Sequence, residues 1–334
     1  MRNYKNDKLR VMVTGANGFV GRALTDFLTN SDIQVIPCVR NLPKANEFGD
    51  LVVFECGNIY KETNWQEALT KVDVVVHTAA RVHVMSDKSL NPLDEFRRVN
   101  VDATVNLARQ AYEAGVKRFI YLSSVKVNGE SSTYGNSLKS SDLPNPVGDY
   151  AISKLEAEQQ LFKLSVDTNL EIVIIRPPLI YGRGVKANFA KLASVVKRGF
   201  PLPFGRITQN ARSMVSLYNL IDFISVCLQH PAATNEVFMV SDGEDVSTAD
   251  LAIRMAKVYK RKLWLIPVPV SILDKAAYLI SKQDSLARLV GSLQVDIQKN
   301  FDLLYWKPKM NLDDGLSAAL DTRVEKRINQ GSKL

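Results

Sequence analysis

The chain has 334 residues, of which 46% are hydrophobic and 23% are charged, and its formal net charge is +8. These fractions are those of ordinary globular proteins and exclude disordered, collagen-like and coiled-coil chains. The length suits one large domain, or a core domain with a smaller partner. Because basic and acidic residues are interleaved rather than clustered, we expect no nucleic-acid partner.

Targeting segments, cysteines and apolar stretches indicate where the protein is located and whether it binds metal. Residues 1–9 lack the apolar core of a secretory signal, so we expect a cytoplasmic protein. The three cysteines match no metal-ligand spacing, which predicts free thiols and no metal site. Prolines and charges interrupt the apolar stretch Leu263–Ile280, so we expect no transmembrane segment. Its part Ile266–Ile280 is instead a candidate for peripheral contact with a membrane surface.

Strand-like and helix-like runs alternate along the first half of the chain. The predicted strands are short and apolar, as strands buried on both faces are; they are Arg10–Thr14, Ile33–Val39, Leu51–Glu55, Val72–His77, Arg118–Leu122 and Glu171–Ile175. The predicted helices between them are Phe19–Thr29, Trp65–Leu69, Leu93–Ala114 and Tyr150–Leu164. This alternation predicts an α/β fold, a Rossmann-type doubly wound parallel sheet.

After Pro178 the pattern loosens into loops that contain glycine and proline. The elements predicted there are the strand Glu236–Val240 and the helices Ala187–Lys197, Leu217–Gln229 and Thr248–Tyr259. We therefore predict a Rossmann domain in residues 1–180. Residues 181–334 are expected to form mainly a smaller C-terminal lobe, with some segments returning to the first domain.

A glycine-rich turn, Gly15-Ala16-Asn17-Gly18-Phe19-Val20-Gly21, joins the first predicted strand to the first predicted helix. Because Gly15, Gly18 and Gly21 have no side chains, backbone N–H groups can approach a pyrophosphate there. The N-terminus of the helix adds about half a positive charge to hold it. In this strand–turn–helix context the glycines predict a dinucleotide cofactor.

The end of the second predicted strand indicates which dinucleotide binds. A carboxylate at this point selects a free 2′-hydroxyl on the adenosine ribose, whereas an arginine accommodates a 2′-phosphate. Arg40 follows Val39, and the next carboxylate along the chain is Glu47. We predict NADP(H) in preference to NAD(H).

Tyr150 and Lys154 are four residues apart and share one face of a predicted helix. A lysine and the positive nicotinamide of an oxidised cofactor favour the phenolate, which lowers the pKa of a tyrosine from about 10 toward that of a general acid/base. Such a pair is common by chance. Ser124, at the end of the preceding strand, adds a hydroxyl that can bind a substrate oxygen. Together the three residues predict a catalytic set.

The ordered motifs resemble those of the extended short-chain dehydrogenases/reductases, the NAD-dependent epimerase/dehydratase family. Further motifs that carry the resemblance are His77-Thr78-Ala79-Ala80, Arg98-Val99-Asn100-Val101, Arg176-Pro177-Pro178, Trp306-Lys307-Pro308 and Asp314-Gly315-Leu316. They extend the resemblance over nearly the whole chain. It implies that residues 1–180 bind the dinucleotide, that the C-terminal lobe binds a nucleotide-activated sugar, and that His77 packs beside the cofactor turn.

The resemblance also implies roles for individual residues. Those in cofactor binding, besides the glycine-rich turn, Arg40, Tyr150 and Lys154, are Asn58, Ile59, Ala79, Ala80, Asn100 and Pro177. Ser124 is expected to orient the substrate, Tyr150 to move the proton, and Lys154 to tune Tyr150 and hold the nicotinamide ribose. Candidates for substrate binding are Ser124, Lys126, Asn188 and Arg212, with Arg81, Arg183 and Arg288 as weaker ones. Relatives form homodimers through the counterparts of Leu93–Ala114 and Tyr150–Leu164, so we expect a homodimer.

The residues after Ser124 restrict the reaction. Family members that eliminate water carry an acidic pair at this point, whereas Val125 and Lys126 follow Ser124, which argues against a dehydratase. Arg40 favours an exchanging NADPH, so we expect a UDP-4-keto-6-deoxy-(N-acetyl)hexose 4-reductase. The alternative is a UDP-glucose or UDP-N-acetylglucosamine 4-epimerase with bound NAD. A catalytically idle cofactor-sensing scaffold is a third interpretation.

Overall fold

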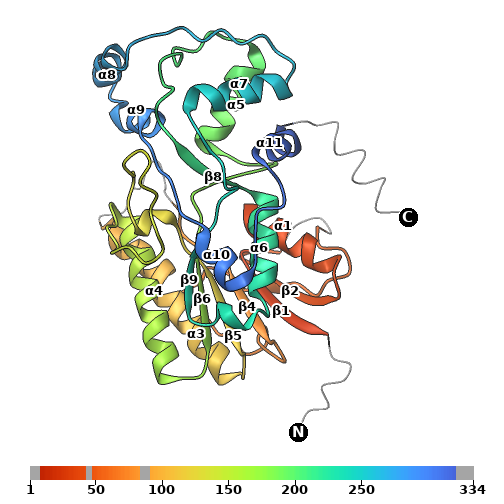
Figure 1. Cartoon of the computed structure of the whole chain (residues 1–334). Coiled ribbons are helices and arrows are strands. Elements are labelled where there is room, and N and C mark those ends of the chain that lie inside the picture. Colours follow the sequence, from red (N-terminus) through yellow and green to blue (C-terminus); the bar gives the residue numbers. More distant parts are fainter. Residues whose placement is uncertain (1–7, 43–46, 83–90, 321–334) are drawn as a thin grey trace.

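A seven-stranded parallel sheet forms the centre of the computed structural model, which describes residues 8–42, 47–82 and 91–320 (Figure 1). Its strands, in the order β3-β2-β1-β4-β5-β6-β9, are Phe54–Glu55, Ile33–Val39, Leu9–Thr14, Val74–His77, Arg118–Leu122, Glu171–Arg176 and Glu236–Met239. The order reverses between β1 and β4, and ligands of such sheets bind beyond the carboxyl ends of strands at this point. The predicted doubly wound α/β fold is confirmed.

The sheet is buried on both faces because successive side chains of each strand point to opposite sides. Val11 and Val13 of β1 pack into one core, whereas Met12 between them packs into the other. Helices α1 (Phe19–Thr29) and α6 (Leu217–Cys227) cover the first face. Helices α3 (Ala103–Glu113) and α4 (Asp149–Asp167) cover the second.

The C-terminal lobe is built around a smaller sheet in the order β10-β8-β7. These strands are Asp245–Val246, Arg212–Ser216 and Leu179–Tyr181. A third core joins them to helices α5 (Ala187–Arg198), α7 (Thr248–Val258) and α11 (Leu312–Leu320). Helices α8 (Val270–Leu279) and α9 (Gln283–Val290) lie at the end of the lobe away from the large sheet, whereas α10 (Gln298–Leu304) lies beside β9 (Figure 1).

Three predicted elements differ from the structure. Trp65–Leu69 is a series of turns rather than a helix, because one bond from the Leu69 N–H to the Trp65 carbonyl cannot offset the cost of starting a helix. Only Phe54–Glu55 of the predicted strand Leu51–Glu55 pairs with β2. The predicted helix Leu93–Ala114 consists of α2 (Pro92–Arg97), a π-helical turn at Arg98–Asp102, and α3.

No helix within the described parts of the chain is long and apolar enough to cross a membrane. The three cysteines are free thiols, as predicted from their spacing. Of the other two histidines, His83 lies outside the described residues, and His230 is half-buried.

Candidate active site

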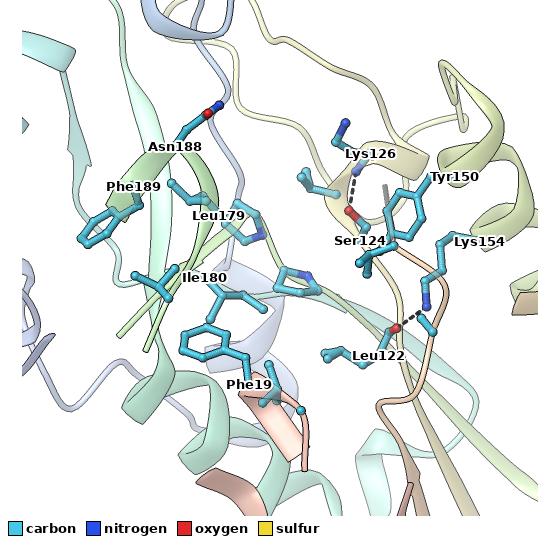
Figure 2. A pocket seen from close by; sticks show the side chains of 18 of the residues that line it. Phe19, Leu122, Ser124, Lys126, Tyr150, Lys154, Leu179, Ile180, Asn188 and Phe189 are labelled. Atoms are coloured by element: carbon cyan, nitrogen blue, oxygen red, sulfur yellow. Dashed lines mark hydrogen bonds between the residues drawn. The ribbon is translucent and has the colours of Figure 1, made fainter. Parts of the chain in front are cut away.

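A cavity of about 1560 Å³ extends from the carboxyl ends of the large sheet into the C-terminal lobe. One half is lined by the glycine-rich turn after β1 and by residues that follow β2, β3 and β4. The other half is lined by residues of β7, α5, β8, α7 and α9. Ser124, Tyr150 and Lys154 line the wall that follows β5 and begins α4 (Figure 2).

The glycine-rich turn leaves no room for a side chain at Gly15 or Gly21. A Cβ atom on Gly21 would lie 2.2 Å from the Gly15 carbonyl oxygen, and one on Gly15 would lie 3.0 Å from the backbone of Ala79. Gly15 also has a φ of +65°, which only glycine adopts readily. The N-terminus of α1 lies at this turn, so its backbone N–H groups and positive dipole suit a pyrophosphate. These residues fit a dinucleotide cofactor.

His77 joins the ends of β1 and β4 below this turn. Its Nδ1 lies 2.7 Å from the Thr14 Oγ1, and its Nε2 lies 3.0 Å from the Thr104 Oγ1. Burial lowers the pKa of His77 to about 3, so the ring is neutral and holds structure rather than moving protons. The predicted position of His77, beside the cofactor turn, matches this geometry.

Lys154 reaches from α4 to the end of β5. Its Nζ donates a hydrogen bond of 2.8 Å to the Leu122 carbonyl and lies 4.4 Å from the centre of the Tyr121 ring (Figure 2). The same Nζ lies 6.0 Å from the centre of the Tyr150 ring. The Ser124 side chain lies beside Tyr150, and its Oγ accepts a hydrogen bond of 3.3 Å from the Lys126 N–H (Figure 2). The structure thus brings together the three residues predicted to form the catalytic set.

Burial dominates the pKa values of this set. It raises the pKa of Tyr150 to about 12, and a hydrogen bond with Ser124 opposes the rise. Burial lowers the pKa of Lys154 to about 7, and the carboxylate of Glu158 opposes that change. In the chain without cofactor the pKa of Tyr150 is therefore raised, because desolvation of the phenolate outweighs the hydrogen bond with Ser124; the predicted lowering requires the positive nicotinamide as well as Lys154.

A buried ion pair lies behind this set and was missed by the sequence analysis. The Arg176 Nε lies 3.1 and 3.2 Å from the two carboxylate oxygens of Glu158, which also accept a hydrogen bond from the Ser123 hydroxyl. Arg176 donates a further bond of 2.9 Å to the Asn128 Oδ1. Asn128 in turn donates 3.2 Å to the Lys139 carbonyl. The pair therefore joins α4, β6 and the loop that follows Ser124.

Asn100 is the predicted cofactor residue that does not line the cavity. It lies in the π-helical turn, where its side chain accepts 2.8 Å from the Arg81 N–H and donates 3.0 Å to the Arg81 carbonyl. It also donates 3.0 Å to the Ser153 Oγ. Asn100 thus holds the backbone of the cavity-lining residue Arg81 and does not itself line the cavity, in contrast to the predicted role in cofactor binding.

The other predicted residues line the cavity. On the cofactor side they are Gly15, Asn17, Gly18, Phe19, Val20, Gly21, Arg40, Asn58, Ile59, Ala79, Ala80, Tyr150, Lys154 and Pro177. Of the predicted substrate residues, Ser124 and Lys126 line the cavity after β5, and Asn188 and Arg212 line it from the C-terminal lobe; of the weaker candidates Arg81 and Arg288 also line it, whereas Arg183 lies outside the lining. Lining residues that the sequence analysis missed include Asn41, Tyr60, Glu130, Phe204, Thr248 and Leu293. Most of them follow no motif, so only the tertiary structure identifies them.

Charged groups on the lobe side are arranged around Arg212. Its Nη1 donates 3.1 Å to the Gly291 carbonyl. Burial lowers the pKa of this guanidinium, and Glu130 opposes the shift. Lys126 Nζ lies 2.5 Å from the Glu130 carboxylate. A compact group of cations with one carboxylate is suited to an anionic ligand with hydroxyl groups.

The doubly wound sheet, the glycine cradle and the Ser, Tyr and Lys side chains on one wall define a Rossmann-type enzyme that uses a nicotinamide dinucleotide. The chain belongs to the NAD dependent epimerase/dehydratase family, whose model matches residues 11–241.

Known proteins resemble the chain over nearly its whole length. It is 48% identical to a Vibrio cholerae protein named UDP-glucose 4-epimerase, over 91% of this chain and 92% of that protein. A UDP-glucuronic acid 4-epimerase from Bacillus cereus in complex with NAD has a TM-score of 0.76, at 22% identity over 94% of this chain and 96% of that one. RMD from Pseudomonas aeruginosa, complexed with NADPH, has a TM-score of 0.69 at 20% identity, over 93% and 98%. The two solved structures establish the fold alone.

Removing one partner of the buried ion pair should destabilise the protein strongly. Glu158→Gln leaves the Arg176 charge buried without its counterion, which costs about 3–5 kcal/mol. The double variant Glu158→Met/Arg176→Met removes both charges and should recover much of that loss. Asp32→Asn, which breaks the exposed pair of Lys8 and Asp32, is the matched control and should change little. Urea unfolding measures all three, and a Glu158→Gln variant as stable as Asp32→Asn would contradict the assignment.

The pKa of Lys154 should appear in the pH dependence of stability. Because the folded pKa of about 7 lies below the usual lysine value of 10.5, the unfolded chain binds one proton more between these values, so stability rises with pH there. Relative to Lys154→Met, the free energy of unfolding of the cofactor-free wild type should rise by about 1.4 kcal/mol per pH unit above about pH 8. Urea unfolding at several pH values measures it.

Lys163→Met changes an exposed lysine of the same helix and is the control. It should keep the pH dependence of the wild type. A Lys154→Met variant whose stability runs parallel to that of the wild type would show that Lys154 titrates as an ordinary lysine.

Proposed function

We propose that the chain is a UDP-sugar 4-epimerase, with UDP-glucose or UDP-N-acetylglucosamine as its substrate. The observation that carries the proposal is the 48% identity, over 91% of the chain, to a protein named UDP-glucose 4-epimerase. It supports the alternative that the sequence left open rather than the 4-reductase that we expected. Val125 and Lys126, which follow Ser124, supply no acidic pair for a dehydratase.

The cavity supports this chemistry by its division into two halves. The glycine-rich turn, Arg40 and the residues after β3 and β4 would hold a nicotinamide dinucleotide, which when bound supplies reversible hydride transfer. Arg212, Asn188 and Lys126 would bind the nucleoside diphosphate and sugar on the lobe side. The sugar would then lie beside Ser124 and Tyr150, between the two halves.

Tyr150 would move the proton of the sugar hydroxyl at C4. Ser124 orients that hydroxyl and donates to the oxygen while it is a carbonyl. Because burial raises the pKa of Tyr150 to about 12, the phenolate needs positive charge nearby, which protonated Lys154 and an oxidised nicotinamide would provide. Tyr150 takes the proton when the sugar is oxidised and returns it when the hydroxyl forms again on the other face.

The wall across the cavity suits a sugar that must present both faces. Leu179 and Ile180 of β7 lie opposite Ser124 and Tyr150 (Figure 2). These aliphatic side chains offer no hydrogen bond that would fix a keto sugar in one orientation. A reductase, which adds hydride to one face, gains nothing from such a wall, whereas an epimerase requires the freedom.

Other predictions remain to be tested. They are the division at residue 180, the cytoplasmic location, and the homodimer through Leu93–Ala114 and Tyr150–Leu164. Asn100 we now assign to positioning, through its contacts with the Arg81 backbone.

The epimerase reaction should be measurable with no redox partner. UDP-glucose and UDP-N-acetylglucosamine, incubated separately with the purified enzyme and NAD⁺, should each be followed for the 4-epimer by proton NMR. Tyr150→Phe should lower kcat by about 10²- to 10⁴-fold because it removes the general acid/base. Tyr112→Phe, at an exposed position of α3, is the control and should keep full activity. NADPH oxidation with a UDP-4-keto-6-deoxy sugar, and no epimer from either substrate, would establish the reductase instead.

Arg40 should give the site affinity for NADP(H) at least equal to that for NAD(H). Arg40 is exposed at the end of β2 and lines the cavity, where its guanidinium can bind a 2′-phosphate. The 2′-phosphate takes no part in hydride transfer, so an epimerase can use either cofactor. Arg40→Glu should weaken NADP⁺ binding by about 10- to 100-fold, the loss of one charge-assisted hydrogen bond, and leave NAD⁺ binding nearly unchanged. Calorimetric titration measures both, and equal loss for the two cofactors would refute the assignment.

A further inference from the structure

Helix α8 and the segment leading into it expose apolar side chains at the end of the C-terminal lobe. The exposed residues, which we call the α8 surface, are Trp264, Ile266, Ile272, Tyr278, Leu279 and Ile280. Leu279 is 83% exposed and Ile280 is 67% exposed, so these side chains are almost fully in solvent. Exposed apolar residues are common singly, but a group of this size marks an interaction site.

The periodicity of α8 shows that this exposure is a property of one face. Ala277 is the buried residue of α8, and α8 packs against α9. Ile272, Ala276 and Leu279 recur at the spacing of one helix face and point away from Ala277. Helix α8 has ten residues and is apolar on two faces. One face packs against the rest of the lobe, and the other is available to bind a partner.

Basic residues are frequent in the segment that carries this apolar face. Between residues 260 and 282 the chain has Lys260, Arg261, Lys262, Lys275 and Lys282, against the single acidic residue Asp274. Lys262 Nζ lies 5.0 Å from the centre of the exposed Trp264 ring. Apolar and aromatic side chains bordered by lysine and arginine match the interface of an anionic bilayer, where rings reach the acyl boundary and cations meet phosphate groups.

The charges also argue against a second copy of the chain on this surface. Two copies would bring like cations together around an apolar contact, which costs free energy as the contact is desolvated. An anionic lipid surface neutralises the same cations. We propose that the α8 surface binds the anionic face of a lipid bilayer, with helix α8 lying in the plane of the interface.

This mode of binding would place one wall of the cavity close to the lipid. Helix α9 packs against α8. Its cavity-lining residues include Lys282 at its N-cap, Ser285 in its first turn and Arg288 in its last turn. One helix diameter, about 10–12 Å, therefore separates the proposed lipid contact from the substrate half of the cavity. The contact leaves the cofactor half untouched, so it does not depend on which sugar reaction the cavity performs.

Vesicle cosedimentation with the full-length protein tests the proposal. The wild type should bind vesicles of phosphatidylglycerol and phosphatidylcholine at least about tenfold more tightly than vesicles of phosphatidylcholine alone, and salt should weaken the binding. Ile272→Ser/Leu279→Ser should lose at least about tenfold in partition coefficient. The control Val52→Ser/Val166→Ser changes two valines that are 84% and 85% exposed on the large domain, and it should bind as the wild type does.

Tryptophan fluorescence locates the contact within the bound protein. Trp65 and Trp306 are buried, whereas Trp264 is 59% exposed, so quenching by brominated phosphatidylglycerol should come from Trp264 and vanish in Trp264→Phe.

Epimerase activity and thermal unfolding of each serine variant show whether it is folded. Wild type that stays in the supernatant with anionic vesicles, or a folded Ile272→Ser/Leu279→Ser variant that binds as the wild type does, would overturn the proposal. Light scattering that shows this variant losing a dimer, with no vesicle binding by the wild type, would assign the surface to self-association instead.

Discussion

The buried ion pair of Arg176 and Glu158 fixes the geometry on which the active site depends. Two charges that are almost wholly removed from water are tolerated only when each keeps its partner and its remaining hydrogen bonds. Glu158 follows Lys154 by one turn of α4, and the same carboxylate binds the Ser123 hydroxyl beside Ser124. The pair therefore holds the helix that carries Tyr150 and Lys154 against the strand end that carries Ser124, so the three residues that we propose as the catalytic set cannot separate without exposing a buried charge.

The same carboxylate also sets the electrostatic balance of the site. Lys154 is buried, which favours its neutral form, but Glu158 one turn away favours the ammonium, and the pKa of about 7 lies between these tendencies. Arg176 draws on the same carboxylate and limits how far it can raise that pKa. The pKa of Lys154 is thus brought down toward neutral pH. A small change in nearby charge, such as a bound cofactor brings, can then shift the lysine and with it the tyrosine.

Sequence reasoning succeeded where the signal is local. The glycines of the turn, the spacing of Tyr150 and Lys154, and the apolar strands could be predicted because each depends on neighbours within a few residues. Arg176 was noted only as part of a motif, and its pairing with Glu158 was missed because nothing in either segment identifies the other as a partner. Asn100 was placed near the cofactor by its motif, but a π-helical turn directs its amide to the Arg81 backbone. The reaction was predicted less well than the fold, since Arg40 bears on the cofactor and not on the fate of the hydride.

The substrate half of the cavity is built from segments that lie far apart in the sequence, whereas the cofactor half follows local motifs. This difference explains why the sequence did not identify the sugar. Its parts are joined by backbone bonds across long separations: the Leu138 N–H donates 2.8 Å to the Gln294 carbonyl, and the Ser213 N–H donates 2.8 Å to the Leu293 carbonyl. The segment after α9 thus lies between the loop that follows Ser124 and strand β8 with Arg212. The segment therefore borders the substrate half of the cavity on two sides, and no local motif marks it.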